Sequence, residues 1–429
     1  MSGRRDGGSS SPGRRVAVRT FQLGLLALAG LSSAGAGDVV ESVRTFLSQP
    51  ASERGEIAAA DFADDPLTAE EATAVIGLLR EKRVAKMRAD RAAEHEARAI
   101  TVGPHTLQYL TRSFGEPAGE DEANAGRPLL ISMHGGGNTL TGINDRQWRN
   151  QIRLYELEKG IVVAPRAPTD TWNLWHEAHI DPLLDRLIEN MILFEGVDPN
   201  RVYLTGYSAG GDGTYQLAPR MSDRFAGAAM MAGHPNETVA DGLRNVPFAL
   251  HMGGEDAAYR RNAIARDWQT RLAKLRQADP GGYEHEVVIR EGLGHWMNGL
   301  DREGITWIMQ FERNRRPDRV VWVQDDVTHR RLYWLAIQPA DVKAGDQLIV
   351  RREGNRFSVE RADVRQFKLL LDDSMIDFDR PVIVTFGGQT VLMAQVKRTV
   401  AAIANSLRSR PDPSVCATAR LSVRLPEAK

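Results

Sequence analysis

Six short apolar runs that alternate with longer amphipathic segments constrain the fold of this 429-residue chain more than any other feature. The runs are LLISMHG, IVVAPRA, RVYLTGYS, GAAMMAG, PFALHMGG and HEVVIREG, and helix-like segments such as 182–194 and 262–278 lie between them. Strands that alternate with helices require crossover connections and therefore a parallel sheet. Apolar runs without strict alternation are typical of strands covered on both faces. Residues 101–316 are therefore predicted to form an α/β domain with a mostly parallel, doubly wound sheet.

The segment before this domain, residues 37–100, has the composition of helices. Thr68 and Glu71 have the spacing of a capping box, and a stretch rich in Ala, Glu, Arg and Lys follows them. We expect a helical arm that packs on the main domain and carries no chemistry.

The segment after the main domain, residues 317–429, has a different pattern of apolar and polar residues. Eight short apolar runs separated by turn residues predict a smaller β-rich domain, with one helix-like interruption at 399–408. This domain is a candidate for binding a polymer or a cell-surface partner through Trp322 and Trp334. The alternative is that both indoles belong to the core of the small domain, which is the more common finding.

The N-terminal residues 1–36 have the pattern of a secretory signal peptide. A basic region is followed by an apolar run at 21–31 and an A-x-A ending at Ala36. The run is short for a membrane span, so we expect none. Arg14 and Arg15 permit twin-arginine export as well as the general route. The sequence thus predicts a periplasmic or extracellular protein, with a disordered arginine-rich tail as the alternative for this segment.

Charge and cysteine content exclude several classes of function. The net charge is −1 and the isoelectric point is near 6.8, so no global field favours nucleic acid, although a local basic patch stays open. The single cysteine, Cys416, rules out an intrachain disulfide and a cysteine-rich metal site. We expect this thiol to be a small core residue.

The strongest chemical signal is the sequence Gly206-Tyr207-Ser208-Ala209-Gly210, which directly follows an apolar strand. A serine at a tight strand-to-helix turn needs small neighbours, because the strained backbone must approach adjacent strands closely. Ser208 would then project above the carboxyl edge of the sheet, where open α/β folds bind ligands. We therefore expect Ser208 to be a nucleophile, and Tyr207 to line the substrate site.

A glycine run after an earlier strand predicts an oxyanion-binding loop. Acyl transfer places negative charge on a carbonyl oxygen, and backbone N–H groups must be aimed at that oxygen. The expected donors are the N–H of Ala209 and one from the sequence HGGG at 134–137, with Gly136 as first choice and Gly137 as second. His134, at the start of this loop, is expected to contact substrate.

A serine nucleophile needs a base, and the base needs an acid. His295 lies in a glycine-rich loop after the last apolar run, whereas His251, His285 and His234 lie in or beside strands. The turn GGED at 253–256 supplies Asp256 as the expected acid, with Glu255 as runner-up. Asp212, close to the nucleophile, is expected to cap or to pair within its helix.

Aromatic residues near these motifs are candidates for the wall of a substrate cleft. Trp172 and Trp175 follow the second apolar run of the domain, and Trp296 is beside the expected base. They are expected to stack on a sugar or an aromatic group, or simply to pack. His176, His179 and Asp181 have a spacing that metal ligands can adopt, but no partner cluster is evident, so no metal is predicted.

The HGGG loop, the GYSAGG elbow, the GGED turn and the GHWM histidine motif resemble those of secreted α/β-hydrolases of the phospholipase/carboxylesterase and polyhydroxybutyrate-depolymerase-like esterase type. The resemblance covers about residues 101–316, and the tail resembles an extension that accompanies some bacterial members. It implies the α/β-hydrolase fold and ester hydrolysis through an acyl-enzyme without metal or organic cofactor. The implied substrates are a small acyl ester, an acylated polysaccharide or a lysolipid. Depolymerases often carry disulfides, which this chain cannot form.

Two other functions fit parts of the pattern. A serine peptidase of the prolyl-oligopeptidase type has the same fold and order of catalytic residues, but such enzymes usually carry a β-propeller, which the helical residues 37–100 do not supply. A binding protein with an inert hydrolase domain is the alternative from another class, although every catalytic element is present.

Overall fold

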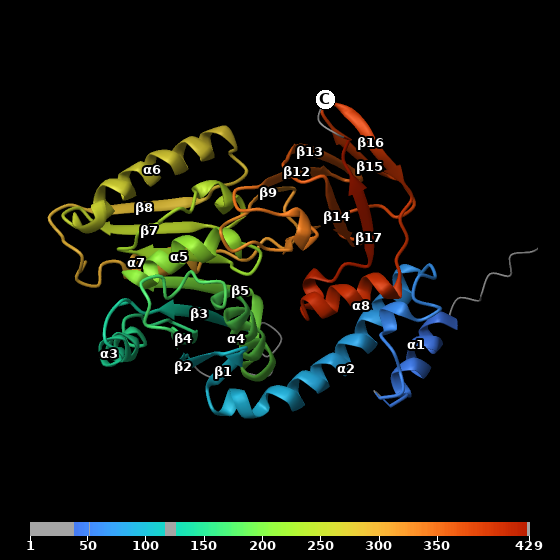
Figure 1. The fold of residues 1–429 in the computed structure, drawn as a ribbon, viewed down its shortest axis with the longest axis horizontal. Coiled ribbons are helices and arrows are strands. Elements are labelled where there is room, and N and C mark those ends of the chain that lie inside the picture. Colours follow the sequence, from blue (N-terminus) through green and yellow to red (C-terminus); the bar gives the residue numbers. More distant parts are fainter. Residues whose placement is uncertain (1–37, 51, 116–125, 427–429) are drawn as a thin grey trace, which may run out of the picture.

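The computed structural model describes residues 38–50, 52–115 and 126–426, so the expected signal peptide at 1–36 lies outside the described residues. Figure 1 shows a large α/β part, a β-rich part toward the C-terminus, and N-terminal helices that run along both. Within the described ranges, every helix is too short or too polar to cross a membrane.

The large part is built on one eight-stranded sheet with the order β1-β2-β4-β3-β5-β6-β7-β8. Strands β3 to β8 are parallel to one another, and β1 and β2 extend the sheet in antiparallel fashion beside β4. This arrangement is the α/β-hydrolase fold, so the predicted parallel sheet is confirmed. The strands are β1 (Ala99–Val102), β2 (His105–Phe114), β3 (Arg127–Met133), β4 (Gly160–Arg166), β5 (Val197–Tyr207), β6 (Gly227–Met231), β7 (Phe248–Gly253) and β8 (His285–Arg290).

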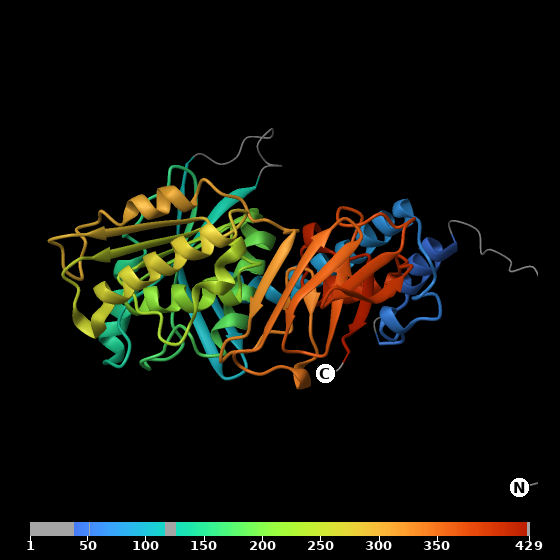
Figure 2. The same ribbon diagram turned by 90° about the horizontal axis from the view of Figure 1, so that it is seen from above.

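Helices cover both faces of this sheet. Figure 2 shows α6 and α7 on opposite sides of the strands β7 and β8. All seven residues of β4 are buried, as expected for a strand covered on both faces. The helices are α3 (Thr141–Gln151), α4 (Ile180–Glu195), α5 (Ala209–Arg220), α6 (Arg261–Ala278) and α7 (Arg302–Ile308).

The N-terminal helices differ from the expected arm, because they pack on two parts of the protein. Helix α1 spans Asp38–Ser48, and α2 spans Ala69–Glu96 with the predicted capping box at its start. The first half of α2 packs with α1 and with α8 (Val400–Ser409), in a small apolar core that also holds Cys416. The second half is polar and reaches α4 of the main domain through ion pairs such as Arg91–Glu189, at 2.8 Å. The arm therefore bridges the C-terminal part and the α/β part of the chain.

The C-terminal part has two sheets around its own apolar core. Trp322 and Trp334 are buried in this core, so neither indole forms a polymer-binding surface. One sheet has the order β10-β11-β14-β17 and the other β16-β15-β13-β12-β9. The strands are β9 (Arg319–Val323), β10 (Arg331–Leu332), β11 (Leu335–Ala336), β12 (Gln347–Glu353), β13 (Arg356–Ala362), β14 (Gln366–Leu371), β15 (Val382–Phe386), β16 (Gln389–Ala394) and β17 (Ala419–Arg424).

Buried polar contacts fix the C-terminal part to the end of α5. Asp223, three residues after this helix, accepts hydrogen bonds from Arg410 Nη1 at 2.5 Å and from the Tyr333 N–H at 3.0 Å. Arg220, the last residue of α5, pairs with Asp181, whose other oxygen lies 2.5 Å from His329 Nε2. The helix that begins after Ser208 is therefore held at its far end by the β-rich part.

Candidate active site

Ser208 occupies a strained turn between β5 and α5. Its backbone has φ 58° and ψ −120°, a conformation that a non-glycine residue adopts only where the surroundings enforce it. The turn is tight because a Cβ on Gly206 would lie 2.0 Å from the Gly210 carbonyl oxygen. The Ser208 N–H donates to the Met231 carbonyl at 2.9 Å, which ties the turn to β6.

The structure brings Asp256 and His295 together from two separate loops. Asp256 follows β7 and His295 follows β8, and His295 Nδ1 lies 2.6 Å from Asp256 Oδ2. The Asp256 side chain is almost completely buried, while the runner-up Glu255 is exposed. Arg261 Nη1 lies 3.9 Å from the other oxygen of Asp256. A buried carboxylate in this position fixes the imidazole orientation and stabilises its protonated form.

Ser208 and His295 line the same cavity, which has a volume of about 490 Å³. Gly135, Gly136 and Trp296 line it as well. Tyr207 also lines it and holds the histidine loop, since its hydroxyl donates to the His295 carbonyl at 2.7 Å and accepts the Met297 N–H at 3.1 Å. The expected nucleophile and base therefore face one space.

The other histidines weighed for the role of the base are engaged elsewhere. His251 is buried within β7 beside Glu286, at 3.2 Å, and His285 Nδ1 contacts the Tyr283 carbonyl at 2.7 Å. His234 lies against Asn236.

The N–H groups expected to bind an oxyanion differ in whether they already have a hydrogen-bond partner. Gly137 N–H already donates to Asn144 Oδ1 at 3.0 Å, whereas Gly136 N–H and Ala209 N–H have no hydrogen-bond partner within the described residues. Gly136 has φ +111°, and a Cβ there would lie 2.2 Å from Asn144 Oδ1. The geometry thus favours Gly136 over Gly137 as the partner of Ala209 for an oxyanion.

His134 and Trp175 are placed differently from our expectation. Both side chains are completely buried, so neither can contact a substrate. The His134 Nδ1–H donates to the Gly135 carbonyl at 2.6 Å, its Nε2 accepts the Ala167 N–H at 3.2 Å, and Trp175 Nε1 donates to the His134 carbonyl at 2.8 Å. Burial lowers the pKa of His134 to about 4, which keeps the ring neutral. These residues hold the glycine loop, and the expectation of substrate contact is corrected accordingly.

The remaining aromatic candidates are exposed, and Trp296 lines the cavity that holds Ser208 and His295. Trp172 is 46% exposed and Trp296 is 52% exposed. The Trp172 ring lies 5.3 Å from that of Tyr259, a residue that the sequence did not single out. Tyr259 has φ 54° and lies next to the guanidinium of Arg261, so the loop after Asp256 presents an aromatic side chain. In the sequence, only the position of Tyr259 after the GGED turn indicated that this tyrosine lies near the site.

Asp212 is buried behind the nucleophile. Its Oδ1 accepts the His234 N–H at 2.6 Å, and burial raises the pKa of Asp212 to about 6. Asp212 also accepts a hydrogen bond from its own backbone N–H, and its contact with His234 ties the loop after β6 to α5.

Of the three residues with metal-ligand spacing, Asp181 is engaged with other groups, whereas the buried Nε2 atoms of His176 and His179 have no hydrogen-bond partner within the described residues. Asp181 pairs with Arg220 and His329, and the His179 ring stacks on His105 with centroids 3.8 Å apart. One acidic group in the described ranges has oxygens within 4.8 Å of one another, and Arg220 Nη1 lies 3.9 to 4.0 Å from two of its members. A guanidinium therefore already supplies the positive charge there. The members are Glu237, Asp325 and Asp326.

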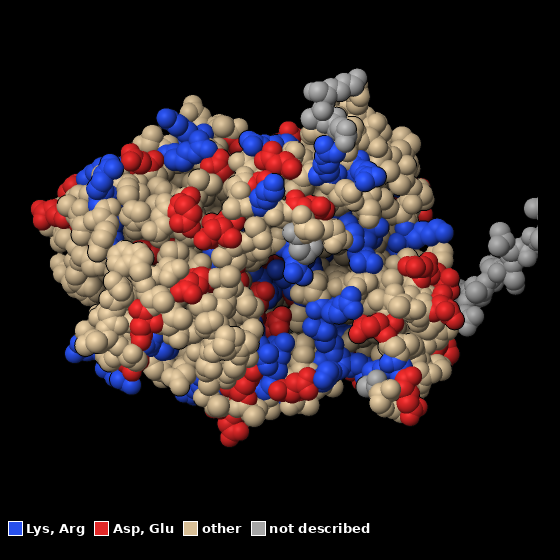
Figure 3. Space-filling model, viewed as in Figure 1, with Lys and Arg blue, Asp and Glu red and all other residues tan. Residues whose placement is uncertain are grey.

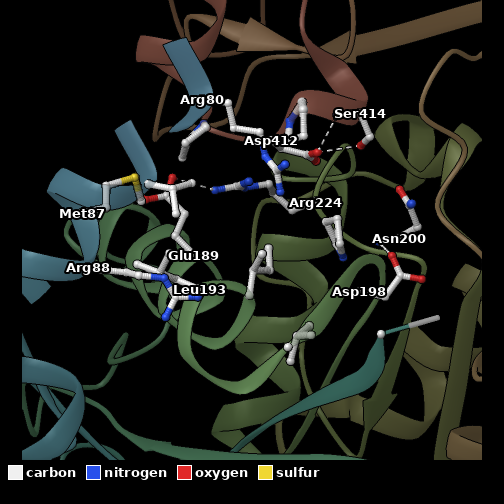
Figure 4. A pocket seen from close by; sticks show the side chains of 18 residues that line it. Arg80, Met87, Arg88, Glu189, Leu193, Asp198, Asn200, Arg224, Asp412 and Ser414 are labelled. Atoms are coloured by element: carbon white, nitrogen blue, oxygen red, sulfur yellow. Dashed lines mark hydrogen bonds and ion pairs between the residues drawn. The ribbon is translucent and has the colours of Figure 1, made fainter. Parts of the chain in front are cut away.

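A separate cavity of about 520 Å³ lies where α2, α4 and the segment 411–414 meet (Figure 4). Three of the charged residues that line it, Glu189, Arg224 and Asp412, are in ion pairs. Glu189 lies beside Arg91 and Arg224, and Asp412 accepts from Arg313 Nη2 at 2.6 Å. This cavity is a junction between the three parts of the protein and contains none of the expected catalytic residues.

Comparison with known proteins supports the esterase resemblance over part of the chain. No protein family model matches. The chain is 30% identical over 122 residues to "Poly(3-hydroxyalkanoate) depolymerase C" of Paucimonas lemoignei, covering 26% of this chain and 29% of that protein. It is 31% identical over 145 residues to "Putative esterase NocK" of Nocardia uniformis subsp. tsuyamanensis, covering 32% of this chain and 41% of the relative. The chain thus spans less than half the length of the curated relatives it matches.

Similar solved structures include a thermostable esterase, with 19% identity, a TM-score of 0.36, and coverage of 50% of this chain and 62% of that chain. Another is LpqC, a poly(3-hydroxybutyrate) depolymerase from Bordetella parapertussis, with 18% identity, a TM-score of 0.36, and coverage of 49% and 86%. These TM-scores are low, so the fold is assigned from the strand order. The chain has the α/β-hydrolase fold, and its matched segments resemble those of polyhydroxyalkanoate depolymerases and esterases.

Proposed function

We propose that the protein is a serine-dependent carboxylic-ester hydrolase with Ser208, His295 and Asp256 as its catalytic triad. The observation that carries this proposal is the 2.6 Å contact between His295 and buried Asp256, in a loop beside the cavity that Ser208 lines. The partial similarity to an esterase and to depolymerases supports the same reaction class.

In this mechanism His295 accepts the proton of the Ser208 hydroxyl as its oxygen attacks the acyl carbon. The negative charge that develops on the carbonyl oxygen is bound by the N–H groups of Gly136 and Ala209. The protonated His295 then gives its proton to the leaving alcohol, which departs and leaves an acyl-serine. A water molecule, deprotonated by His295, attacks this ester and releases the carboxylic acid and free Ser208.

Short hydroxyacid esters, acylated polysaccharides and lysolipids are the proposed substrates. Trp296 lines the cavity and is exposed, and the exposed Trp172 lies against Tyr259 in the loop after Asp256, so both rings are available to stack on a sugar or an aromatic acyl group. Residues 1–36 are proposed to direct export, and N-terminal sequencing of secreted protein tests this: a mature chain that begins at Gly37 is the expected result.

The activity is tested with p-nitrophenyl esters from acetate to laurate. We expect hydrolysis that is lost in Ser208→Ala and His295→Ala and retained in Ser113→Ala, which alters an exposed serine on β2. Equal rates in all four proteins would contradict the proposed triad. If no ester is hydrolysed, a peptidase activity becomes the next hypothesis to test, and a purely binding role the one after it.

A further inference from the structure

The C-terminal part contains a second cavity, of about 390 Å³, between its four-stranded sheet and α8. Its wall on the sheet side is the face turned away from the apolar core. Lys368 on β14 and Ser422 on β17 are direct cross-strand partners there, and Ala336 and Arg331 continue the same row across β11 and β10. Arg420 lies in an adjacent row opposite Leu370.

The lining of this cavity has five cationic side chains and no carboxylate. Serine, asparagine and glutamine side chains supply further hydrogen-bond donors around it. Figure 3 shows lysine and arginine side chains gathered over the junction of the C-terminal sheet with α8. The charge is local, because the whole chain has a net charge of only −1. The cationic residues are Arg330, Arg331, Lys368, Arg408 and Arg420.

Most of these cations form no ion pair in the described ranges, although the carboxylates of Asp64 and Asp223 act on Arg420 and Arg331 from beyond ion-pair distance. Within the part of the chain that the structure describes, only Arg408 forms an ion pair, with the exposed Glu56 at 3.0 Å. Arg331 binds neutral oxygens alone: the Ser409 hydroxyl at 2.8 Å and the Val415 carbonyl at 3.1 Å are two of them. Burial, and then the nearby Arg410, lower the pKa of Arg331. Such a group gains stability when an anion arrives.

The C-terminal turn of α8 explains only part of this arrangement. Unpaired carbonyls at a helix C-terminus carry partial negative charge and attract cations, which accounts for Arg331 beside Ser409. Lys368 and Arg420 lie on the same sheet as Arg331, and no hydrogen bond within the described residues joins them to α8. Positive charges grouped on one wall, with Arg408 on the facing helix, repel one another unless an anion lies between them.

We propose that this cavity is a binding site for a tetrahedral oxyanion, phosphate or sulfate, either free or carried as an ester on a sugar. Guanidinium groups present several N–H donors in a plane and suit phosphate and sulfate oxygens, and Lys368 adds a point charge. Donors that converge from β10, β14, β17 and α8 match an ion with oxygens on all sides better than a planar carboxylate. The site is independent of the proposed esterase reaction.

The test is calorimetric titration of the full-length protein with inorganic phosphate, inorganic sulfate, glucose 6-phosphate and acetate at one ionic strength. Lys368→Gln and Arg420→Gln remove exposed or partly exposed charges from the sheet wall without disturbing the core. Lys397→Gln, an exposed lysine of the same domain outside the cavity, is the matched control.

We expect phosphate and sulfate to bind more tightly than acetate, with at least a tenfold loss of affinity in the double variant and none in the control. Tighter binding of glucose 6-phosphate than of inorganic phosphate would identify a phosphorylated sugar as the ligand, and the reverse order would identify the free ion. Equal affinity in the double variant and the wild type, or acetate binding as tight as phosphate, would overturn the proposal. Ester hydrolysis by the same variants is expected to be unchanged.

Discussion

His295 and Asp256 lie 39 residues apart in sequence and meet with Nδ1 2.6 Å from Oδ2. Asp256 is only 3% exposed, so its charge is little screened by water. An acceptor at this position requires the imidazole to carry its proton on Nδ1, which leaves Nε2 free to accept a proton. The orientation of the base is therefore set by one buried carboxylate.

Replacing that carboxylate tests the relationship directly. Asp256→Asn is expected to lower kcat by roughly 10³- to 10⁴-fold with little change in KM, because the amide no longer fixes the reactive tautomer. Steady-state kinetics on a p-nitrophenyl ester give both constants. Glu255→Gln, which changes the exposed neighbour, is the control and should retain wild-type kcat. A larger loss in Glu255→Gln than in Asp256→Asn would reassign the acid.

The sequence indicated the main features of the fold because the strands are continuous apolar runs. All six predicted runs are strands β3 to β8, and the capping box at Thr68 and Glu71 begins α2. Strands β1 and β2 were not predicted, because the burial of β2 alternates and its polar residues obscure the pattern. The packing of α2 against α8 could not be predicted either, since it depends on contacts between segments more than 300 residues apart.

The site was predictable where a motif fixes the backbone, as at Ser208, and less so where burial decides the role. His134 opens the glycine loop and Trp175 follows the second apolar run of the domain, which made substrate contact a reasonable expectation. Both side chains are completely buried because the loop packs against α5, and no local sequence pattern predicts this packing. Tyr259 was not predicted, because no sequence pattern distinguishes an exposed tyrosine near a site from any other tyrosine in a turn.

Asn144 is expected to position the oxyanion loop. Its Oδ1 accepts the Gly137 N–H and its Nδ2 donates to Asp170 at 2.7 Å. Asn144→Ala frees the loop, and a displacement of about 1 Å at reacting groups costs about 10²-fold in rate. We expect kcat to fall by about that factor with a smaller change in KM. Thr141→Val removes only the exposed hydrogen bond to the same Asp170 and should leave kcat within a few-fold of wild type.

Asp212 is expected to destabilise the folded protein above neutral pH. Burial raises its pKa to about 6 in the folded state, against 3.8 as the ordinary value. The folded state therefore holds this proton more tightly, and stability is lost as pH rises from about 4 through 6. The difference corresponds to about 3 kcal/mol at pH 8. Asp212→Asn, whose amide oxygen can still accept the His234 N–H, should raise Tm at pH 8 and have little effect at pH 4. A gain of equal size at both pH values would show that ionisation is not the cause.

Asp223 is expected to couple the folding of the two large parts of the chain. Burial alone would raise the pKa of Asp223, but the Arg410 guanidinium together with the charges of Arg224 and Arg331 outweighs it and holds the value at about 2. Asp223→Asn leaves Arg410 buried beside a neutral group, and breaking a buried pair in this way costs about 3 to 5 kcal/mol. The free energy of unfolding from urea denaturation at pH 7 should fall by that amount.

The matched control for Asp223 is Asp90→Asn, which breaks the exposed Lys86–Asp90 pair and should cost less than about 1 kcal/mol. Because Asp223 belongs to the α/β part and Arg410 to the β-rich part, both parts should unfold in one transition in the wild type. In Asp223→Asn the transition should broaden or separate into two, with Trp322 and Trp334 reporting on the β-rich part. Two separate transitions already present in the wild type would mean that the buried pair does not join the parts.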